Sequence, residues 1–267
     1  MSADLHIHSN VSDGSDTIPA IIEMAKKKGL DAIAITDHDT LSHLSKITYD
    51  PLLQVIGGIE ISASHKKTNT KAHILGYSIQ RPELVMALTQ PLLEARNRNS
   101  EKQVTILQDQ GFRIDMAMLA RADGRYLYKQ HIMEFLVNTD QIGEMFGGFY
   151  QSVFKNGGIC DFEIEYVDVF DAIRSIKEAG GIAVLAHPGQ QQIFWLIPDL
   201  VRCGLNGLEL NHPSHNEYDK MKIREIAARH GLFLTGGSDY HGKYEPTTFG
   251  IGDFLSDESG VIAICQK

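Results

Sequence analysis

The sequence contains little cysteine, with three residues in 267: Cys160, Cys203 and Cys265. They stand far apart and form no CxxC pair, which excludes a zinc knuckle and a dense disulfide framework. Isolated cysteines are typical of proteins that keep their thiols reduced. We therefore expect a cytoplasmic protein.

Targeting segments, long apolar runs and an excess of positive charge are also missing. Charged residues begin at Asp4, unlike a signal peptide, and no stretch is apolar for long enough to span a bilayer. The 25 Lys and Arg residues are outnumbered by 34 Asp and Glu, for a formal net charge of −9. We expect no membrane partner. We also expect no binding to extended nucleic acid, because such binding needs a basic face on the protein.

Histidine and acidic residues, by contrast, recur where short apolar runs end. His6 and His8 alternate in an extended segment, so their side chains project to the same side. The same residue types follow later at Glu60, His73, His187, Asp239 and His241. Imidazole and carboxylate ligands together suit Zn, Mn or Fe better than Ca or Mg. The pattern predicts metal-dependent hydrolysis.

Both ends of the chain alternate between strand and helix patterns. Short apolar strands are predicted at residues 5–8, 31–36, 53–56, 182–186, 205–210 and 232–235. Apolar residues at i, i+3, i+4 and i+7 predict helices between them, as over 18–25 and 169–176. Such alternation predicts a parallel sheet, open or closed into a barrel, with working residues just beyond the strand ends. Gly57-Gly58 is expected to form a turn before Glu60.

The middle of the chain breaks this alternation. From residue 81 to residue 165 the pattern is mostly helical and charged, with glycine pairs at 147–148 and 157–158. We predict that residues 1–80 and 166–267 form one α/β domain. Residues 81–165 then form a helical insertion that acts as a lid beside the site.

Eight motifs follow one another along almost the whole chain. They are His6-Ile7-His8, Ser12-Asp13-Gly14, Thr36-Asp37-His38-Asp39, Gly58-Ile59-Glu60, His73, His131, Ala186-His187-Pro188 and Ser238-Asp239-Tyr240-His241. In this order they resemble the PHP (polymerase and histidinol phosphatase) family of metal-dependent phosphoesterases. The resemblance implies a distorted (β/α)7 barrel and a phosphoric ester hydrolase. The helical insertion resembles a subgroup with phosphatases of nucleotides and nucleoside 3′,5′-bisphosphates, and enzymes that trim RNA from the 5′ end.

The resemblance also implies a site for two to three divalent ions, Mn, Fe or Zn. Its ligand positions are all filled here, in three sets: His6, His8, Glu60 and Asp239; Glu60, His73 and His131; and Asp13, His38 and His241. Two ions that share Glu60 would lie roughly 3.5–4 Å apart and hold a bridging hydroxide, since metal binding lowers the pKa of water to about 7. We therefore expect hydroxide attack on phosphorus.

Among the ligands, Glu60 and Asp239 serve catalysis by holding the ions. Two further residues need not be ligands. His187 is expected to act on the phosphate or the leaving oxygen, as hydrogen-bond donor or general acid. Asp37 is expected to orient a ligand imidazole from the second layer.

Two departures from the family pattern concern the substrate. Lys129-Gln130 stands where Arg-Pro often precedes the histidine, and the run 189–192, Gly-Gln-Gln-Gln, lacks an Arg that often follows Ala-His-Pro. Arginine clamps phosphate with two parallel hydrogen bonds, which glutamine cannot reproduce. The candidates for substrate contact are Arg125, Lys129, His212 and His215.

We expect a phosphomonoesterase acting on a small phosphorylated metabolite, foremost a nucleotide or nucleoside 3′,5′-bisphosphate. A 5′–3′ phosphodiesterase that shortens oligonucleotides is the nearest alternative. A non-catalytic, metal-stabilised scaffold and hydrolysis of an amide or lactone are alternatives of other classes. The sequence leaves the native metal and the oligomeric state open.

Overall fold

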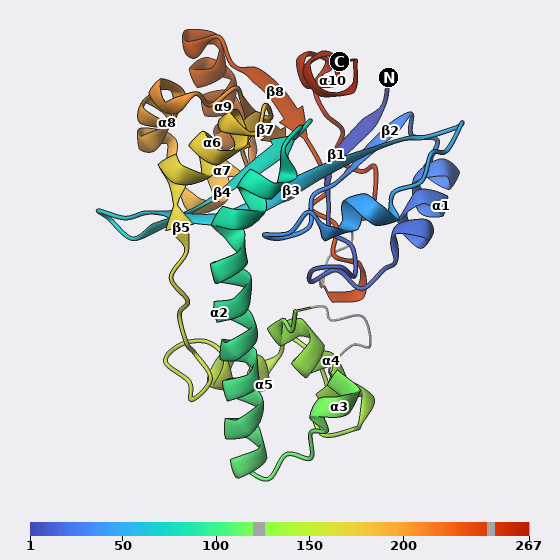
Figure 1. Cartoon of the computed structure of the whole chain (residues 1–267), viewed down its shortest axis with the longest axis vertical. Coiled ribbons are helices and arrows are strands. Elements are labelled where there is room, and N and C mark those ends of the chain that lie inside the picture. The colour runs from blue at the N-terminus through green and yellow to red at the C-terminus, as the bar shows by residue number, and fades with distance from the viewer. Residues whose placement is uncertain (120–125, 245–248, 267) are drawn as a thin grey trace. The chain divides into compact units, whose positions relative to one another are not determined.

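A computed structural model of the chain describes residues 1–119, 126–244 and 249–266. The chain divides into two compact units: Met1–Gln90 with Tyr166–Lys267, and Pro91–Glu165. We call them the barrel unit and the helical unit and describe each by itself (Figure 1).

One sheet forms the centre of the barrel unit. Its strands, in order across the sheet, are β1 (Ala3–Ile7), β2 (Ala32–Ile35), β3 (Gln54–His65), β4 (Thr70–Tyr77), β6 (Ile182–Leu185), β7 (Gly207–Asn211) and β8 (Phe233–Gly236), with β5 (Val167–Asp168) paired to β3. A bridge between Ile7 and Tyr240 joins the end of β1 to the segment after β8. The sheet thus nearly closes on itself, which confirms the predicted distorted barrel.

The sheet is not wholly parallel, however, because β4 is antiparallel to both β3 and β6. The predicted turn at Gly57-Gly58 is also wrong, since β3 continues through both glycines. A Cβ on Gly57 would overlap Leu44, and one on Gly58 would lie 2.9 Å from the Gly76 carbonyl oxygen. These glycines permit close packing against an uninterrupted strand, and Glu60 lies within that strand.

Helices cover the sheet of the barrel unit (Figure 1). They are α1 (Ile18–Lys28), α6 (Val169–Glu178), α7 (Pro188–Gln191), α8 (Ile197–Cys203), α9 (Glu217–His230) and α10 (Glu258–Cys265), with 3₁₀ turns η1 (Ser42–Lys46), η2 (Phe194–Leu196) and η3 (Gly242–Tyr244). The sequence marks the ends of α1 clearly. The Thr17 hydroxyl accepts the Ala20 N–H, and Gly29 ends the helix with a left-handed φ of 74°.

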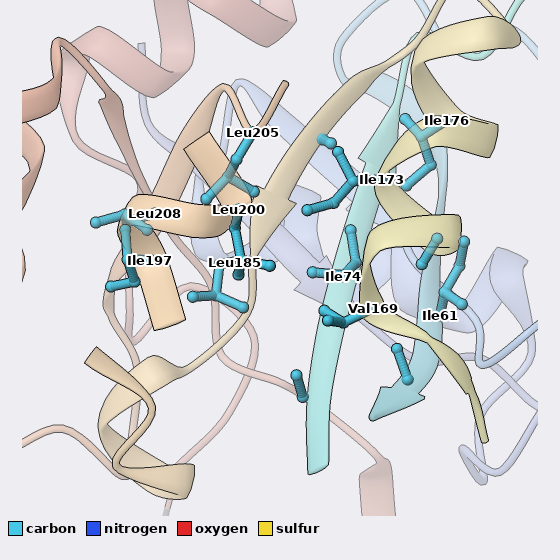
Figure 2. Packing of buried hydrophobic residues seen from close by; sticks show 14 of the residues in the cluster. Ile61, Ile74, Val169, Ile173, Ile176, Leu185, Ile197, Leu200, Leu205 and Leu208 are labelled. Carbon is cyan, nitrogen blue, oxygen red and sulfur yellow. The ribbon is translucent and has the colours of Figure 1, made fainter. Parts of the chain in front are cut away.

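Aliphatic side chains fill the space between the sheet and α6. Ile173 and Ile176 of α6 lie beside Ile61 of β3 and Ile74 of β4 (Figure 2). All four side chains are fully buried. Because β3 carries Glu60 directly before Ile61, this packing also fixes the strand from which Glu60 projects.

The helical unit has a core of its own. Its elements are α3 (Met116–Leu119), α4 (Lys129–Asn138), α5 (Gly148–Val153) and the larger part of α2 (Pro82–Asp109). The boundary between the two units lies inside α2, after Gln90, and Val85 in the preceding part of α2 is buried in the core of the barrel unit. That residues 81–165 form a helical insertion and a lid beside the site remains a prediction. Across the three described ranges, no helix has the length and apolarity needed to cross a membrane.

Replacing Ile173 by Ala is expected to lower the free energy of unfolding by about 2–5 kcal/mol, because a fully buried side chain leaves a cavity. Ile262→Ala in α10 is the matched control: that residue is 52% exposed, so the expected loss is at most about 0.5 kcal/mol. Urea denaturation followed by circular dichroism measures both. Equal losses would contradict the packing described above.

Candidate metal centre

Three strands of the barrel unit bring four predicted ligands to one point. His6 and His8 come from the end of β1, Glu60 from β3, and Asp239 from the segment after β8. The Nε2 atoms of His6 and His8 lie 3.3 and 3.1 Å from Glu60 Oε2, and each lies 3.2 Å from Asp239 Oδ1. The first predicted ligand set is therefore assembled in the structure.

These four atoms fit a divalent ion. Ligand atoms that surround a tetrahedral ion at about 2.0–2.1 Å lie about 3.3–3.4 Å from one another. The Nε2 atoms of His6 and His8 and Asp239 Oδ1 are buried, yet they form no hydrogen bond with the described parts of the chain. Buried polar atoms that face each other without hydrogen bonds are costly unless a cation joins them.

Glu60 extends this cluster through its second oxygen. Oε2 is also 3.3 Å from His38 Nδ1, while Oε1 lies 2.8 Å from His73 Nδ1. His38, Glu60 and His73 offer a second group of potential ligand atoms within 4.8 Å of one another. One carboxylate can therefore serve two neighbouring positions, as the shared role predicted for Glu60 requires.

A third group lies on the other side of His8. It joins the predicted residues Asp13, His38 and His241 to His8, again within 4.8 Å. Asp13 Oδ1 is 3.7 Å from His8 Nδ1 and 3.6 Å from His241 Nε2. Eight of the nine predicted ligands thus gather in the barrel unit.

The ninth predicted ligand, His131, belongs to the helical unit. There its Nδ1 accepts the Tyr128 N–H at 3.2 Å, at the start of α4. Lys129 of the same helix has its Nζ 6.0 Å from the centre of the Tyr150 ring. The site roles of His131 and Lys129 remain predictions, and Arg125 lies outside the described residues.

His187 lies directly beside the shared carboxylate. Its Nε2 is 2.9 Å from Glu60 Oε1, and its Nδ1 is 2.9 Å from the side-chain nitrogen and 3.1 Å from the side-chain oxygen of Gln191. Its φ of 23° is unusual for a residue with a side chain, and Asp239 has a left-handed φ of 51°. Such conformations persist where surrounding contacts enforce them, typically at functional sites.

The two histidines after β7 have different surroundings. His212 Nε2 is 3.3 Å from Asp239 Oδ2, at the edge of the cluster. His215 donates from Nδ1 to the Leu210 carbonyl (2.8 Å) and accepts the Gly189 N–H at Nε2 (3.1 Å). Both ring nitrogens of His215 are thus bonded to the backbone, which argues against the predicted substrate contact. The ring ties the loop after β7 to the start of α7.

Asp37 has partners other than the expected ligand imidazole. It accepts hydrogen bonds from the Ser9 N–H (2.8 Å) and hydroxyl (2.8 Å) and from the Ser12 hydroxyl (2.7 Å), and it lies 3.0 Å from His43 Nδ1. These contacts hold the turn that leads to Asp13. Asp37 therefore holds in place the loop that carries the predicted ligand Asp13.

Asp4 holds the segment that carries Asp239 in a similar way. Its carboxylate accepts the N–H groups of Ser238 (3.0 Å) and Gly252 (2.8 Å). Burial raises the pKa of Asp4 to about 6, against the lowering effect of these hydrogen bonds. Asp4 thereby ties β1, which carries His6, to the segment that carries Asp239.

The cluster is electrostatically coupled. Burial alone would raise the pKa of Glu60, but the surrounding imidazoles, His38 and His6 first, hold it well below its usual value. Burial would likewise lower the pKa of His6, yet Glu209, Asp239 and Glu60 raise it well above the usual value. The imidazoles and the buried carboxylates therefore stabilise each other's charged forms.

Glu209 is a carboxylate beside the cluster that the motifs did not reveal. It is fully buried in β7, with Oε1 3.0 Å from His6 Nδ1 and Oε2 accepting the His187 N–H at 2.8 Å. The available signal was an acidic residue between Leu208 and Leu210, in a strand that is otherwise apolar.

The PHP domain pattern matches residues 4–182. The chain belongs to the PHP domain family. As the resemblance implied, it is a metal-dependent phosphoesterase.

Relatives extend over nearly the whole PHP chain. It is 44% identical to the phosphoribosyl 1,2-cyclic phosphate 1,2-diphosphodiesterase of Eggerthella lenta, over 91% of this chain and 95% of the relative. It is 30% identical to the 3′,5′-nucleoside bisphosphate phosphatase of Chromobacterium violaceum, over 89% and 86%. A crystal structure from Bifidobacterium adolescentis, named for metal-dependent phosphoesterase activity, superposes with a TM-score of 0.87 at 27% identity, covering 99% of this chain and 95% of that one.

Mn²⁺ is expected to raise the melting temperature of the metal-free PHP protein, because it binds the folded cluster and stabilises it by mass action. At a concentration 100 times the dissociation constant the gain is about 2.7 kcal/mol. His8→Ala is expected to remove most of the shift, whereas His230→Ala, at the end of α9, should retain it. Equal Mn²⁺ shifts in all three proteins, measured by scanning calorimetry, would place the binding site elsewhere.

Mn²⁺ binding at pH 7 is expected to release protons. Neighbouring carboxylates raise the pKa of His6 and of His8 against the effect of burial, so the metal-free rings hold protons that the ion must displace. Affinity should therefore fall as the pH is lowered from 8 to 6. Titration calorimetry in Pipes and in Tris measures the released protons, and a binding enthalpy independent of the buffer would disagree.

Proposed function

We propose that this protein hydrolyses a small phosphate ester of a pentose, using two to three divalent ions of Mn, Fe or Zn. The observation that carries the proposal is the convergence of buried imidazole and carboxylate atoms at 3.1–3.3 Å around Glu60 and Asp239. The ions would be held by His6, His8, Asp13, His38, Glu60, His73, His131, Asp239 and His241. When bound, they supply Lewis acidity and a water-derived nucleophile near neutral pH.

His187 is the proposed donor to the phosphate or the leaving oxygen. Its Nε2 lies 2.9 Å from Glu60 Oε1, beside the atoms that would hold the ions, and this position supports the role. The side-chain amide of Gln191 contacts Nδ1 and fixes the plane of the ring. Gln191 therefore orients the proposed donor His187. It is not proposed to bind the phosphate as an Arg at this place would.

His212 is a second proposed donor. Its Nδ1 accepts the Ser214 N–H at 3.1 Å, so the proton of the neutral ring resides on Nε2. Nε2 faces Asp239 Oδ2 at 3.3 Å. A neutral His212 can thus donate to Asp239 or to a phosphate oxygen, as expected of a substrate contact.

The relatives favour one substrate within this class. The protein with 44% identity is named for phosphoribosyl 1,2-cyclic phosphate, and the protein with 30% identity for nucleoside 3′,5′-bisphosphates. Both are small phosphate esters of a pentose. The higher identity puts the cyclic phosphate first and a nucleoside bisphosphate, the substrate favoured by the sequence motifs, second.

The metal-free protein, reloaded with Mn²⁺, is expected to open the cyclic phosphate faster than it releases phosphate from adenosine 3′,5′-bisphosphate. Loss of the cyclic phosphorus resonance in ³¹P NMR measures the first reaction, and a phosphate assay the second. Asp239→Asn should lower both rates at least about 100-fold. Replacing a residue that only supports a ligand already lowers activity by up to about 100-fold, and Asp239 is a proposed ligand itself. Glu225→Gln, at an exposed position of α9, is the control.

A 5′-phosphorylated RNA oligomer in the same assay tests the alternative activity. Release of mononucleotides from the oligomer, without hydrolysis of either small ester, would contradict the proposal and establish the exonuclease. If the Mn²⁺-bound protein hydrolysed none of the three compounds, the proposed activity on small phosphate esters of a pentose would be contradicted.

A further inference from the structure

Glu209 is a buried carboxylate in the middle of an apolar strand. It lies in β7 with no exposed surface, flanked by Leu208 and Leu210, which are also buried. An ionised carboxylate in such a place is costly unless each oxygen has a partner. Both oxygens of Glu209 have one, and both partners belong to the candidate metal centre.

The first oxygen fixes the protonation of a predicted metal ligand. Glu209 Oε1 lies 3.0 Å from His6 Nδ1, and an ionised carboxylate can only accept. With an ion bound, the one proton of His6 is therefore held on Nδ1. The lone pair of Nε2 is then available to the first ion, which is proposed to bind beside Glu60 and Asp239.

The second oxygen fixes the turn that carries His187. Glu209 Oε2 accepts the His187 N–H at 2.8 Å, at a residue whose φ is 23°. A left-handed backbone at a non-glycine residue needs such a restraint. The restraint directs the ring toward Glu60 Oε1, 2.9 Å from Nε2.

The surroundings favour the ionised form that both contacts require. Burial would raise the pKa of Glu209, but the imidazoles of His6 and His212 and the hydrogen bond with His6 hold it below its usual value. The carboxylate thus accepts from both partners at once.

We propose that Glu209 is a positioning residue that sets the tautomer of His6 and the orientation of His187, so that one carboxylate aligns the first ion's ligand with the proposed donor. The inference rests on the proposed metal centre. Outer partners of ligand imidazoles typically change metal affinity 10- to 100-fold when they are replaced.

Glu209→Gln tests the assignment with almost no change in shape. The amide nitrogen can only donate, so it opposes one of the two N–H groups that the carboxylate accepts. We expect one Mn²⁺ ion to bind about 10- to 100-fold more weakly, as measured by the electron paramagnetic resonance of unbound Mn²⁺. Glu225→Gln should bind Mn²⁺ like the unaltered protein. Unchanged affinity in a folded Glu209→Gln protein would overturn the proposal.

A spectroscopic measurement on the unaltered protein does not depend on the folding of a variant. In the Zn²⁺-loaded protein, long-range ¹H–¹⁵N spectra should show His6 protonated at Nδ1, with slow proton exchange. The signal is assigned by its loss in His6→Ala. His6 protonated at Nε2 would overturn the role of Glu209. Failure of the unaltered protein to bind any Mn²⁺ would instead refute the metal centre itself, so the two failures are distinct.

Discussion

The carboxylate of Glu60 is the group on which the site depends. Five imidazoles lie within 3.3 Å of its two oxygens: those of His6, His8, His38, His73 and His187. Glu60 itself is 1% exposed. A buried negative charge of this kind needs cations around it, whether protons on imidazole or metal ions. The converging strand ends of the barrel unit supply the imidazoles that surround this charge.

The hairpin of β3 and β4 makes this arrangement possible. Ser62 pairs with His73 and Glu60 with Leu75, so Glu60 and His73 are diagonal neighbours on one face of an antiparallel pair. The uninterrupted course of β3 through Gly57 and Gly58 keeps that register. The same strand presents Ile61, on its opposite face, to α6, so the packing of the core and the placement of the site are set together.

Sequence reasoning succeeded where the signal was local. The alternation of His6 and His8, the cap at Thr17 and the apolar spacing of α6 depend on neighbours within a few positions. The resemblance to the PHP family then supplied the barrel and the ligand sets, because its motifs recur in a fixed order along the chain.

The remaining features depend on contacts between distant segments. Gly57-Gly58 reads as a turn unless the close approach of Leu44 and Gly76 is known. His215 resembles a substrate contact until both of its nitrogens are found on the backbone. Glu209 is 203 residues from His6 in sequence, so no spacing rule links them. Outer partners of a ligand come from tertiary packing, and a single sequence carries only the hint of a charge in an apolar strand.

Anomalous X-ray scattering from crystals loaded with Zn²⁺ would show whether the atoms around Glu60 and Asp239 bind an ion. Data collected on both sides of the zinc absorption edge locate each ion without reference to any assumed site. We predict an ion about 2.0–2.2 Å from His6 Nε2, His8 Nε2, Glu60 Oε2 and Asp239 Oδ1. Anomalous peaks only elsewhere, with these four atoms hydrogen-bonded to water, would contradict this prediction.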